Sequence, residues 1–344
     1  MRKVRAAILG ATGAVGQELL GILKERDFPL DSLKLLASPR SAGLKIPFGD
    51  EELTVEAVSP EAFENVDLAF FCAGGSVSKQ YAPEALSRGA VVIDNTSAFR
   101  LDEGVPLVVP EVNATDITPE TKLIANPNCS TILMVMALAP LHRYYGIERV
   151  VVSTYQAVSG VGAKAMDDLC KQVRAWAAGE EVVSSCFPFV AAERHYQMHF
   201  NLIPQIDVFD ELGYTKEEWK MVRETQKILH APDMRITATT VRVPVLRSHS
   251  ESVNVEFKQE VDLGKVRELL AGFPGVVVWD DPENFKYPMP LDVTGKDEVY
   301  VGRIRVDNSH PRAINLWLVG DQIRKGAALN AVQVGEYMVS NGLI

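Results

Sequence analysis

A glycine loop between an apolar run and a helix-like segment is the feature that most constrains the fold. Gly10, Gly13 and Gly16 follow the apolar run 4–9 and open the segment 14–26, which has helical spacing. Glycines placed in this way allow a tight turn, close approach of the backbone to a pyrophosphate, and close helix–strand packing. The spacing Gly-x-x-Gly-x-x-Gly differs from the usual Gly-x-Gly-x-x-Gly fingerprint. A glycine-rich turn without a ligand therefore stays open as an alternative.

Short apolar runs then alternate with helical segments through the first third of the chain. The expected strands are 3–9, 33–37, 67–72 and 90–94, with a helix over 78–87. Such alternation indicates βαβ units on a parallel sheet. Ligands bind at the carboxyl ends of such strands, which here lead into the turns 10–16, 72–76 and 95–100.

Beyond residue 128 the pattern changes to longer strands with alternating polarity. The expected strands are 149–158, 236–243, 252–258, 276–279, 299–306 and 313–319, with a charged helix over 215–229. We expect a mostly antiparallel sheet with one helix-covered face, and a last helix over about 321–338. The prediction is an α/β chain of two domains. Residues 1–128 form a Rossmann-like domain, completed by the C-terminal helix at about 321–344, and residues 129–320 form an α+β domain.

Composition excludes several classes of function. A net charge of −10 argues against a general nucleic-acid surface. The longest apolar runs are about half of the roughly 20 residues that span a bilayer, so no membrane association is expected. The four cysteines show neither CxxC spacing nor a nearby histidine, which argues against disulfides and a metal site. With no signal-peptide pattern at the N-terminus, we expect a cytoplasmic protein.

One cysteine stands out from the others. Cys129 follows Asn126-Pro127-Asn128 and begins an apolar helix, where unpaired N–H groups and the helix dipole favour the nucleophilic thiolate. A cysteine that only packs at a helix start is the alternative. Cys72, Cys170 and Cys186 fit that structural role better, because none follows such a turn.

The end of the second strand indicates which dinucleotide the glycine loop would bind. An NAD site usually has Asp or Glu there, bonded to the ribose 2′-hydroxyl. This chain instead has Ser38-Pro39-Arg40-Ser41, a guanidinium between two hydroxyls, which suits a 2′-phosphate. We therefore predict NADP rather than NAD, with a solvated loop arginine as the alternative.

Several motifs along nearly the whole chain resemble those of the aspartate-semialdehyde dehydrogenase family. They are Gly10-Ala-Thr-Gly-Ala-Val-Gly16, Asn95-Thr-Ser-Ala-Phe-Arg100, Val109-Pro-Glu-Val-Asn113, Asn126-Pro-Asn-Cys-Ser-Thr131, Thr154-Tyr-Gln-Ala-Val-Ser-Gly160, Tyr287-Pro-Met-Pro290, Val301-Gly-Arg-Ile-Arg305 and Gly326-Ala-Ala-Leu-Asn-Ala-Val-Gln333.

The resemblance implies the NADPH-dependent reductive dephosphorylation of L-4-aspartyl phosphate to L-aspartate 4-semialdehyde. This reaction lies on the route to lysine, methionine, threonine and, in bacteria, diaminopimelate. The implied fold is that of phosphorylating glyceraldehyde-3-phosphate dehydrogenases, a nucleotide domain plus a catalytic and dimerisation domain. A homodimer is expected, with a tetramer left open.

The resemblance also implies the chemical roles of individual residues. Cys129 matches the nucleophile that forms a thioester, with Asn128 beside it. His249 matches the acid/base that takes the thiol proton and later acts on the thiohemiacetal oxygen, although its polar surroundings alone suggest a surface turn. Gln156 matches the residue that orients the acyl group, the alternative being an exposed strand position. Arg242 matches the clamp on the substrate carboxylate, with Arg247 as a nearby competitor.

The remaining roles concern the charged ends of the substrate and the cofactor. Glu217 matches the ligand of the substrate ammonium, and Lys220 and Arg100 match the phosphate ligands. A surface ion pair three residues apart on a helix is the alternative for Glu217 and Lys220. The cofactor residues implied, besides Gly10, Gly16, Ser38, Arg40 and Ser41, are Thr12, Gly13, Ala14, Val15, Ser159, Gly160, Gln322 and Asn330.

Three other kinds of protein stay open. An N-acetyl-glutamyl-phosphate reductase runs the same chemistry on a related fold, but its glycine loop and cysteine motif differ; a phosphorylating aldehyde dehydrogenase of sugar metabolism fits less well. A non-catalytic nucleotide-binding relative would usually have lost the nucleophile or the base, whereas this chain keeps Cys129 and His249. Residues 180–200 have no assigned role, and a subunit interface is one interpretation.

Overall fold

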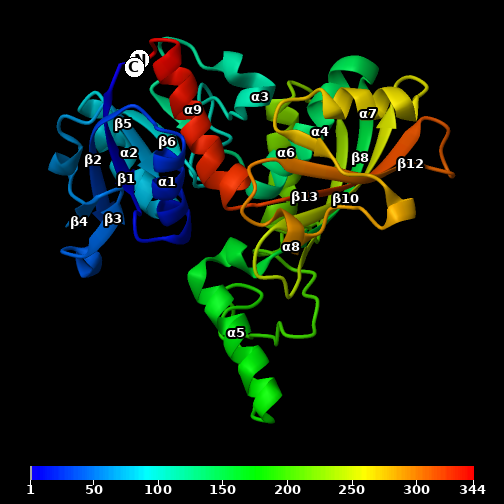
Figure 1. Ribbon diagram of the computed structural model, residues 1–344, viewed down its shortest axis with the longest axis horizontal. Coiled ribbons are helices and arrows are strands. Elements are labelled where there is room, and N and C mark those ends of the chain that lie inside the picture. The colour runs from blue at the N-terminus through cyan, green and yellow to red at the C-terminus, as the bar shows by residue number, and fades with distance from the viewer. Residues whose placement is uncertain (1) are drawn as a thin grey trace. The chain divides into compact units, whose positions relative to one another are not determined.

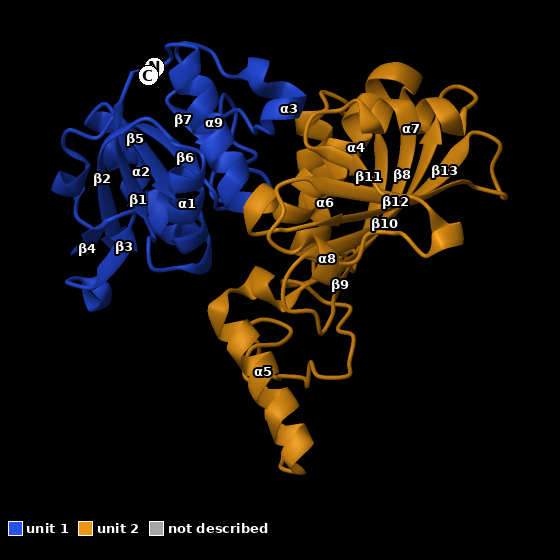
Figure 2. Ribbon diagram, viewed as in Figure 1, with its two compact units in different colours: residues 1–128, 327–344 blue, residues 129–326 orange. Residues whose placement is uncertain are grey.

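The computed structural model describes residues 2–344 as two compact units. Unit 1 comprises residues 1–128 and 327–344, of which Met1 lies outside the described residues, and unit 2 comprises residues 129–326 (Figure 2). The chain passes from one unit to the other between Asn128 and Cys129. None of the helices in the described chain is long and apolar enough to cross a membrane.

Unit 1 is built on a seven-stranded sheet in the order β3-β4-β2-β1-β5-β6-β7 (Figure 1). The strands are β1 (Val4–Leu9), β2 (Leu30–Ala37), β3 (Lys45–Phe48), β4 (Glu51–Ala57), β5 (Leu68–Phe71), β6 (Val91–Asp94) and β7 (Leu123–Ala125). All neighbours are parallel except β3 and β4. The expected Rossmann-like, parallel sheet is confirmed. The β3–β4 hairpin and β7 were not predicted.

Helices cover both faces of this sheet. The helices of unit 1 are α1 (Ala14–Glu25), α2 (Gly75–Ser87), α3 (Pro110–Asn113) and α9 (Leu329–Ser340). Alternate strand residues separate the two cores: Ile8 packs in the core that contains residues of α1 and α9, and Leu9 packs in the core that contains residues of α2. The continuous apolar runs of the sequence therefore reflect strands buried on both faces.

The last helix begins later than the sequence predicts. Residues 324–328 form a π-helical turn, and the regular helix α9 starts only at Leu329. Residues 321–326 belong to unit 2, because the side chains of Asp321 and Gln322 are hydrogen-bonded within that unit. The Asp321 carboxylate accepts from the backbone N–H groups of Ile323 and Arg324, as the residue before a helix does, so the helical turn starts after it.

Unit 2 contains a six-stranded sheet in the order β11-β12-β13-β10-β8-β9. The strands are β8 (Ile147–Gln156), β9 (Arg235–Arg242), β10 (His249–Phe257), β11 (Val276–Val278), β12 (Val299–Val306) and β13 (Ala313–Gly320). Three neighbouring pairs are antiparallel, and the two outer pairs, β11–β12 and β8–β9, are parallel. The predicted, mostly antiparallel sheet is confirmed.

Three helices pack on one face of this sheet (Figure 1), and their ranges are α4 (Cys129–Tyr145), α6 (Lys216–Ile228) and α7 (Leu263–Ala271). Alternate residues of β8 point to the other face and are only half-buried, including Ser153 and Tyr155. The short helix α8 (Pro290–Val293) contacts β13.

Helix α5 (Ala163–Ala178) extends to one side of the sheet of unit 2 (Figure 2). The segment 180–200 contains no regular helix or strand and folds back against α5. Its Phe187 and Met198 form a small core with Leu169 of α5. Large apolar side chains nearby remain exposed, including Trp176 and Phe200.

Candidate active site

Cys129 begins α4 and is the half-buried start of an otherwise buried segment. Every residue from Ser130 to Leu141 is buried, as is Asn128 on the other side. The backbone N–H groups of the first helical turn and the positive end of the helix dipole therefore lie at the thiol. Gly326 of the π-helical turn packs closely on the cysteine, because a Cβ added there would lie 2.9 Å from the Cβ of Cys129. The structure thus presents a half-buried thiol at the start of a buried helix.

Arg242 ends β9 and is a buried cation without an ion-pair partner among residues 2–344. It is 3% exposed, and its guanidinium makes one hydrogen bond, from Nη1 to the carbonyl oxygen of Ala157 at 2.7 Å. Its Nε has no partner among the described residues. Burial lowers the pKa of Arg242, whereas the charges of Glu217 and Cys129 raise it. A buried cation with unused donors is ready to bind an anionic ligand.

His249 begins β10 and is fully buried, so the suggestion of a surface turn is wrong. The strand runs between β8 and β13, and its odd-numbered residues face the helix-covered side of the sheet. The His249 Nδ1 accepts the backbone N–H of Ala157 at 3.0 Å, and its Nε2 has no partner in the described chain. Burial and, to a lesser extent, the Arg242 charge lower the pKa of His249 to about 3, against an opposing effect of Glu217.

Gln156 ends β8 and lies at the centre of a chain of polar side chains. Its Oε1 accepts from the hydroxyl of Thr154 at 3.1 Å, and its Nε2 donates to Glu217 at 3.1 Å. Glu217 in turn accepts from Lys220 Nζ at 2.9 Å. Gln156 is buried rather than on an exposed strand face. Glu217 is also buried, so its contact with Lys220 is not a solvent-exposed ion pair.

Helix α6, which carries Glu217 and Lys220, is fixed at its start by a capping box. Thr215 accepts from the N–H of Glu218, and the Glu218 side chain accepts from the N–H of Thr215. Glu218 also accepts from the backbone N–H of Thr240 in β9. Glu218 therefore serves structure, which separates it from its neighbour Glu217.

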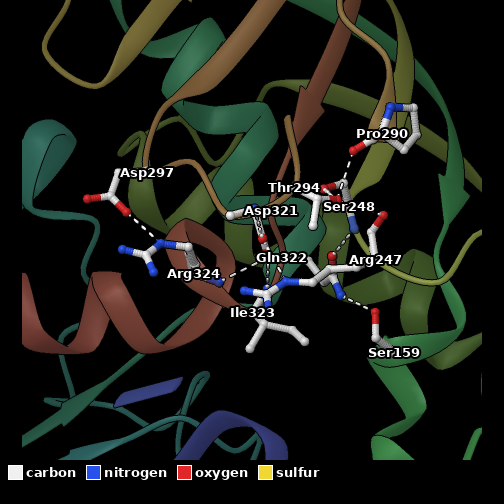
Figure 3. Close-up of polar contacts among 11 residues, drawn as sticks. Ser159, Arg247, Ser248, Pro290, Thr294, Asp297, Asp321, Gln322, Ile323 and Arg324 are labelled. Carbon is white, nitrogen blue, oxygen red and sulfur yellow. Dashed lines mark hydrogen bonds and ion pairs between the residues drawn. The ribbon is translucent and has the colours of Figure 1, made fainter. Parts of the chain in front are cut away.

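Gly160 lies against the guanidinium of Arg242 and the imidazole of His249. A Cβ at this position would lie 2.9 Å from Nη1 of Arg242 and 3.5 Å from Nε2 of His249. Ser159, one residue earlier, accepts a short hydrogen bond from Nε2 of Gln322 (Figure 3). Gln322 also accepts from the backbone N–H of Ser248, the residue before His249, at 2.8 Å. The predicted residues Ser159, Gly160 and Gln322 are thus brought together with His249.

Arg247, the competitor of Arg242, is engaged elsewhere. Its Nε donates to Asp321 at 2.7 Å (Figure 3). The same carboxylate accepts from the backbone N–H of Gly295. Asp321 is fully buried and also accepts from Ile323 N–H. This ion pair fixes the segment before the π-helical turn and leaves Arg242 as the arginine nearest the imidazole.

In unit 1 the three turns expected to form a ligand site do lie together. A Cβ at Gly10 would lie 2.8 Å from the backbone of Cys72 and Ala73, and one at Gly16 would lie 2.3 Å from the oxygen of Gly10. The side-chain amide of Asn95 donates to the carbonyl of Phe71 at 3.2 Å. The glycine loop, 72–76 and 95–100 are therefore adjacent.

The start of α1 suits a pyrophosphate. Gly13 is the N-cap and has no side chain to satisfy the first N–H groups, and no acidic residue occupies the first turn. Thr12 and Gly13 are exposed, and Ala14 and Val15 are half-buried. Open N–H groups at a helix start bind anionic groups well, so the residues present fit a dinucleotide.

The end of β2 carries the predicted ribose site. Arg40 lies in the short helical turn Pro39–Ser41, is exposed like Ser38, and its side chain forms no hydrogen bond or ion pair within the part of the chain that the structure describes. Ser41 is half-buried. A cation with no acidic neighbour is available to a phosphate.

Arg100 and Asn330 are both buried in unit 1. Arg100 donates to the carbonyls of Asn126 at 2.9 Å and Asn95 at 3.0 Å, which ties it to the cysteine motif. Asn330 donates to Val108 oxygen at 2.8 Å and to Asn126 Oδ1 at 2.7 Å. These bonds attach α9 to the sheet edge, and the contact of Asn330 with the cofactor stays a prediction.

Sequence reasoning missed Glu251, Thr154 and the backbone of Ala157. Glu251 is fully buried on β10 with neither oxygen hydrogen-bonded, and burial raises its pKa well above the usual value. The sequence could have indicated Glu251, because it follows His249 by two residues and therefore shares a strand face with it. No cluster of His, Cys, Asp or Glu among residues 2–344 could hold a metal ion.

Two family models match the chain. One, described as "Semialdehyde dehydrogenase, NAD binding domain", matches residues 5–119, and the other, "Semialdehyde dehydrogenase, dimerisation domain", matches residues 138–325. A nicotinamide dinucleotide is thus the cofactor class, and oligomerisation is a property of the second domain.

Similar proteins span the whole chain. Aspartate-semialdehyde dehydrogenase of Bacillus subtilis (strain 168) is 51% identical over 344 residues, covering 100% of this chain and 99% of the relative. The enzyme of the same name from Aquifex aeolicus (strain VF5) is 52% identical and covers 99% of each chain. The crystal structure of aspartate semialdehyde dehydrogenase II complexed with ASA from Vibrio cholerae is 45% identical, with a TM-score of 0.94 and 99% coverage of both chains. The chain therefore belongs to the semialdehyde dehydrogenase family.

Proposed function

We propose that this chain catalyses the NADPH-dependent reductive dephosphorylation of L-4-aspartyl phosphate to L-aspartate 4-semialdehyde, reversibly, in the route to lysine, methionine and threonine. The observation that carries the proposal is the buried guanidinium of Arg242, which has no ion-pair partner among the described residues and whose pKa is raised by the charge of Cys129. It lies beside Gly160 together with the unpartnered Nε2 of His249. An anion-binding cation beside a nucleophile and a proton donor suits a small acidic acyl substrate.

Cys129 is the nucleophile. The start of α4 and the Arg242 charge both favour its thiolate. The sulfur attacks the acyl carbon, the bond from that carbon to the phosphate oxygen breaks, and a thioester to Cys129 results. Covalent catalysis of this kind divides one difficult displacement into two easier steps. Asn128 borders the thiol in the sequence and helps to position it.

Arg242 binds the substrate carboxylate, and Glu217 binds its ammonium group. The guanidinium has unused donors for a two-point contact, which fixes orientation as well as charge. Gln156 holds Glu217 through its amide and presents the same side chain to the acyl group. The buried carboxylate of Glu217 and the buried guanidinium of Arg242 explain the preference for an amino-acid substrate with a free α-carboxylate.

Arg100 and Lys220 are the phosphate ligands. Arg100 is fixed by two carbonyl groups at the cysteine motif. Lys220 is ion-paired with Glu217 at 2.9 Å, so it binds phosphate only when this ion pair rearranges or is shared. Two cations would favour departure of the phosphate as an anion.

NADP rather than NAD is the cofactor that we propose. The loop of Gly10, Gly13 and Gly16 would hold the pyrophosphate with Thr12, Ala14 and Val15, and Arg40 with Ser38 and Ser41 would bind the 2′-phosphate. When bound, the nicotinamide supplies a hydride to the thioester carbon. Ser159, Gly160 and Gln322 form the protein surface toward its ring. His249, whose Nε2 has no partner among the described residues, would take the thiol proton of Cys129 and later act on the thiohemiacetal oxygen.

A homodimer formed through unit 2 is part of the proposal. The sheet face opposite α4, α6 and α7 presents half-buried aromatic side chains, among them Tyr155 and Trp317, whose tilted rings lie 5.5 Å apart between centroids. None of the four cysteines is in a disulfide, and a reactive thiol suits the reducing cytoplasm, where we place the enzyme.

The test measures reduced cofactor when the protein is mixed with L-aspartate 4-semialdehyde, inorganic phosphate and NADP. We expect phosphate-dependent reduction that is lost in Cys129→Ala, while the unfolding transition of the variant stays close to that of the wild type. No reduction with either NADP or NAD would refute the proposal. Activity only with the acetylated five-carbon semialdehyde would reassign the chain to N-acetyl-glutamyl-phosphate reduction.

A further inference from the structure

Ser248, the residue before His249, has an unusual backbone conformation. Its φ angle is +75°, in the left-handed region, and the residue is fully buried. A residue with a Cβ is disfavoured in this conformation by roughly tenfold relative to its usual ones. Such an outlier persists only where its surroundings hold it, and outliers of this kind cluster at functional sites. The contacts of Ser248 therefore show what maintains the conformation.

Two side chains from distant segments of unit 2 hold Ser248 (Figure 3). The backbone N–H of Ser248 donates to Oε1 of Gln322 at 2.8 Å, and its hydroxyl lies 2.8 Å from Oγ1 of Thr294. Thr294 Oγ1 donates to the carbonyl oxygen of Pro290 at 2.8 Å, and the carbonyl oxygen of Arg247 is farther away, at 3.4 Å. Because a hydroxyl has one proton, the hydroxyl of Ser248 is the donor to Thr294. The backbone and the side chain of Ser248 are thus both fixed.

The segment that supplies Thr294 is itself anchored within unit 2. Val293, one residue earlier, ends α8 and is fully buried. Gly295, one residue later, donates its N–H to the buried carboxylate of Asp321 at 2.7 Å. Thr294 therefore offers Ser248 an acceptor in a fixed position, although the residue as a whole is exposed.

The conformation of Ser248 determines where the imidazole of the next residue lies. The Nδ1 of His249 accepts the N–H of Ala157 at 3.0 Å, while its Nε2 has no partner among the described residues. Rotation of Ser248 to a negative φ would turn the chain at the start of β10 and carry the ring away from Ala157. The fixed backbone and the anchored Nδ1 together keep Nε2 in one place.

We propose that Thr294 and Ser248 are positioning residues for His249, and that the hydrogen bond between their hydroxyl groups keeps the imidazole in its working place. This inference rests on the proposed function, which gives His249 its part in the reaction, and deepens it. Neither hydroxyl is assigned to the substrate or the cofactor. The loop between β11 and β12 thereby becomes part of the active site without contributing a catalytic residue.

The first test follows hydrogen exchange of the backbone amide of Ala157 by NMR in the full-length protein. In Thr294→Val the hydroxyl of Ser248 loses its acceptor, whereas Thr294→Ser keeps it. We expect the Ala157 amide to exchange at least about fivefold faster in Thr294→Val than in the wild type, and at the wild-type rate in Thr294→Ser. Equal exchange in all three proteins would overturn the inference, and so would an equal acceleration of amides throughout unit 2. This readout needs no activity, so it is independent of whether the proposed substrate is right.

The second test uses Ser248→Gly, because glycine adopts a left-handed conformation without a steric penalty. We expect Thr294→Val to lower kcat at least about fivefold and to change the KM for the semialdehyde and for NADP by less than about twofold. In the Ser248→Gly background the same substitution should lower kcat by less than about twofold, because the pair of hydroxyls is already lost. Equal losses in the two backgrounds, or a change in KM alone, would overturn the inference. A wild-type protein without activity would refute the proposed function and leave the exchange measurement to decide whether Thr294 positions the ring.

Discussion

The most informative perturbation is the replacement of Arg242 by methionine, because the account assigns this buried cation to the substrate and not to the fold. The guanidinium of Arg242 has one hydrogen bond, to the carbonyl of Ala157, and among residues 2–344 it has no ion-pair partner. Exchange of buried ionic groups for well-packed apolar side chains is often neutral or stabilising, by about 1–4 kcal/mol. Loss of a hydrogen bond to a charged group costs about 1.5–3 kcal/mol. The two effects nearly cancel, so we expect the free energy of unfolding to change by less than about 2 kcal/mol.

Activity should respond very differently. Without the guanidinium, the substrate carboxylate enters a buried site unpaired, which costs about 3–5 kcal/mol. At about 1.36 kcal/mol per factor of ten, kcat/KM should fall by roughly a hundred- to several-thousand-fold. The assay is steady-state reduction of NADP with L-aspartate 4-semialdehyde and phosphate, alongside urea unfolding of the same preparation.

Arg247→Met is the matched control. Arg247 is paired with the fully buried Asp321 at 2.7 Å, so its removal leaves a buried carboxylate and should lower the free energy of unfolding by about 3 kcal/mol. Arg242→Met should therefore lose activity and keep its stability, whereas Arg247→Met should lose stability. A loss of stability in Arg242→Met as large as that of the control, or an unchanged kcat/KM, would refute the reasoning.

Three further perturbations test other parts of the account. Arg40→Ala should raise the KM for NADP at least about tenfold and that for NAD much less, because only NADP carries the 2′-phosphate; equal changes would contradict the ribose assignment. Gly326→Ala places a Cβ 2.9 Å from that of Cys129 and should lower both the rate of thiol alkylation and kcat. An unchanged rate of alkylation would show that the turn does not position the cysteine. Burial raises the pKa of Glu251, so the folded state holds this proton above the unfolded pKa and stability falls as pH rises. Between about pH 5 and 8 the free energy of unfolding should fall less steeply with pH in Glu251→Gln than in the wild type, by up to about 1.4 kcal/mol per pH unit. Parallel pH profiles of the two proteins would contradict this.

Much of the nucleotide domain could be predicted because its strands are buried on both faces. Runs such as Leu68–Phe71 have no competing interpretation once they alternate with helices, and the glycine loop indicates where the chain turns. The β3–β4 hairpin was missed because most of its residues are exposed or half-buried, with Glu51 and Glu52 at the start of β4. Exposed edge strands carry little of the apolar signal that identifies a strand.

The site residues of unit 2 were harder to find, for a physical reason. Polar residues such as His249 and Gln156 are typical of surfaces, yet here they occupy the buried face of a sheet. Their burial depends on partners far away in the sequence, including Ala157 for His249 and Glu217 for Gln156. Local pattern favours a surface turn at His249, and only the resemblance to a family selected it. Buried backbone donors such as the N–H of Ala157 cannot be predicted from the pattern of side chains.

The central claim is that Cys129 forms a thioester with the substrate, and acylation without cofactor tests it most directly. The protein is mixed with L-4-aspartyl phosphate in the absence of NADPH, denatured with acid, and examined by mass spectrometry with peptide mapping. The account predicts one aspartyl group per chain on Cys129, phosphate released in equal amount, and no acylation of Cys129→Ala. Phosphate release without acylation, or modification that persists in Cys129→Ala, would contradict it.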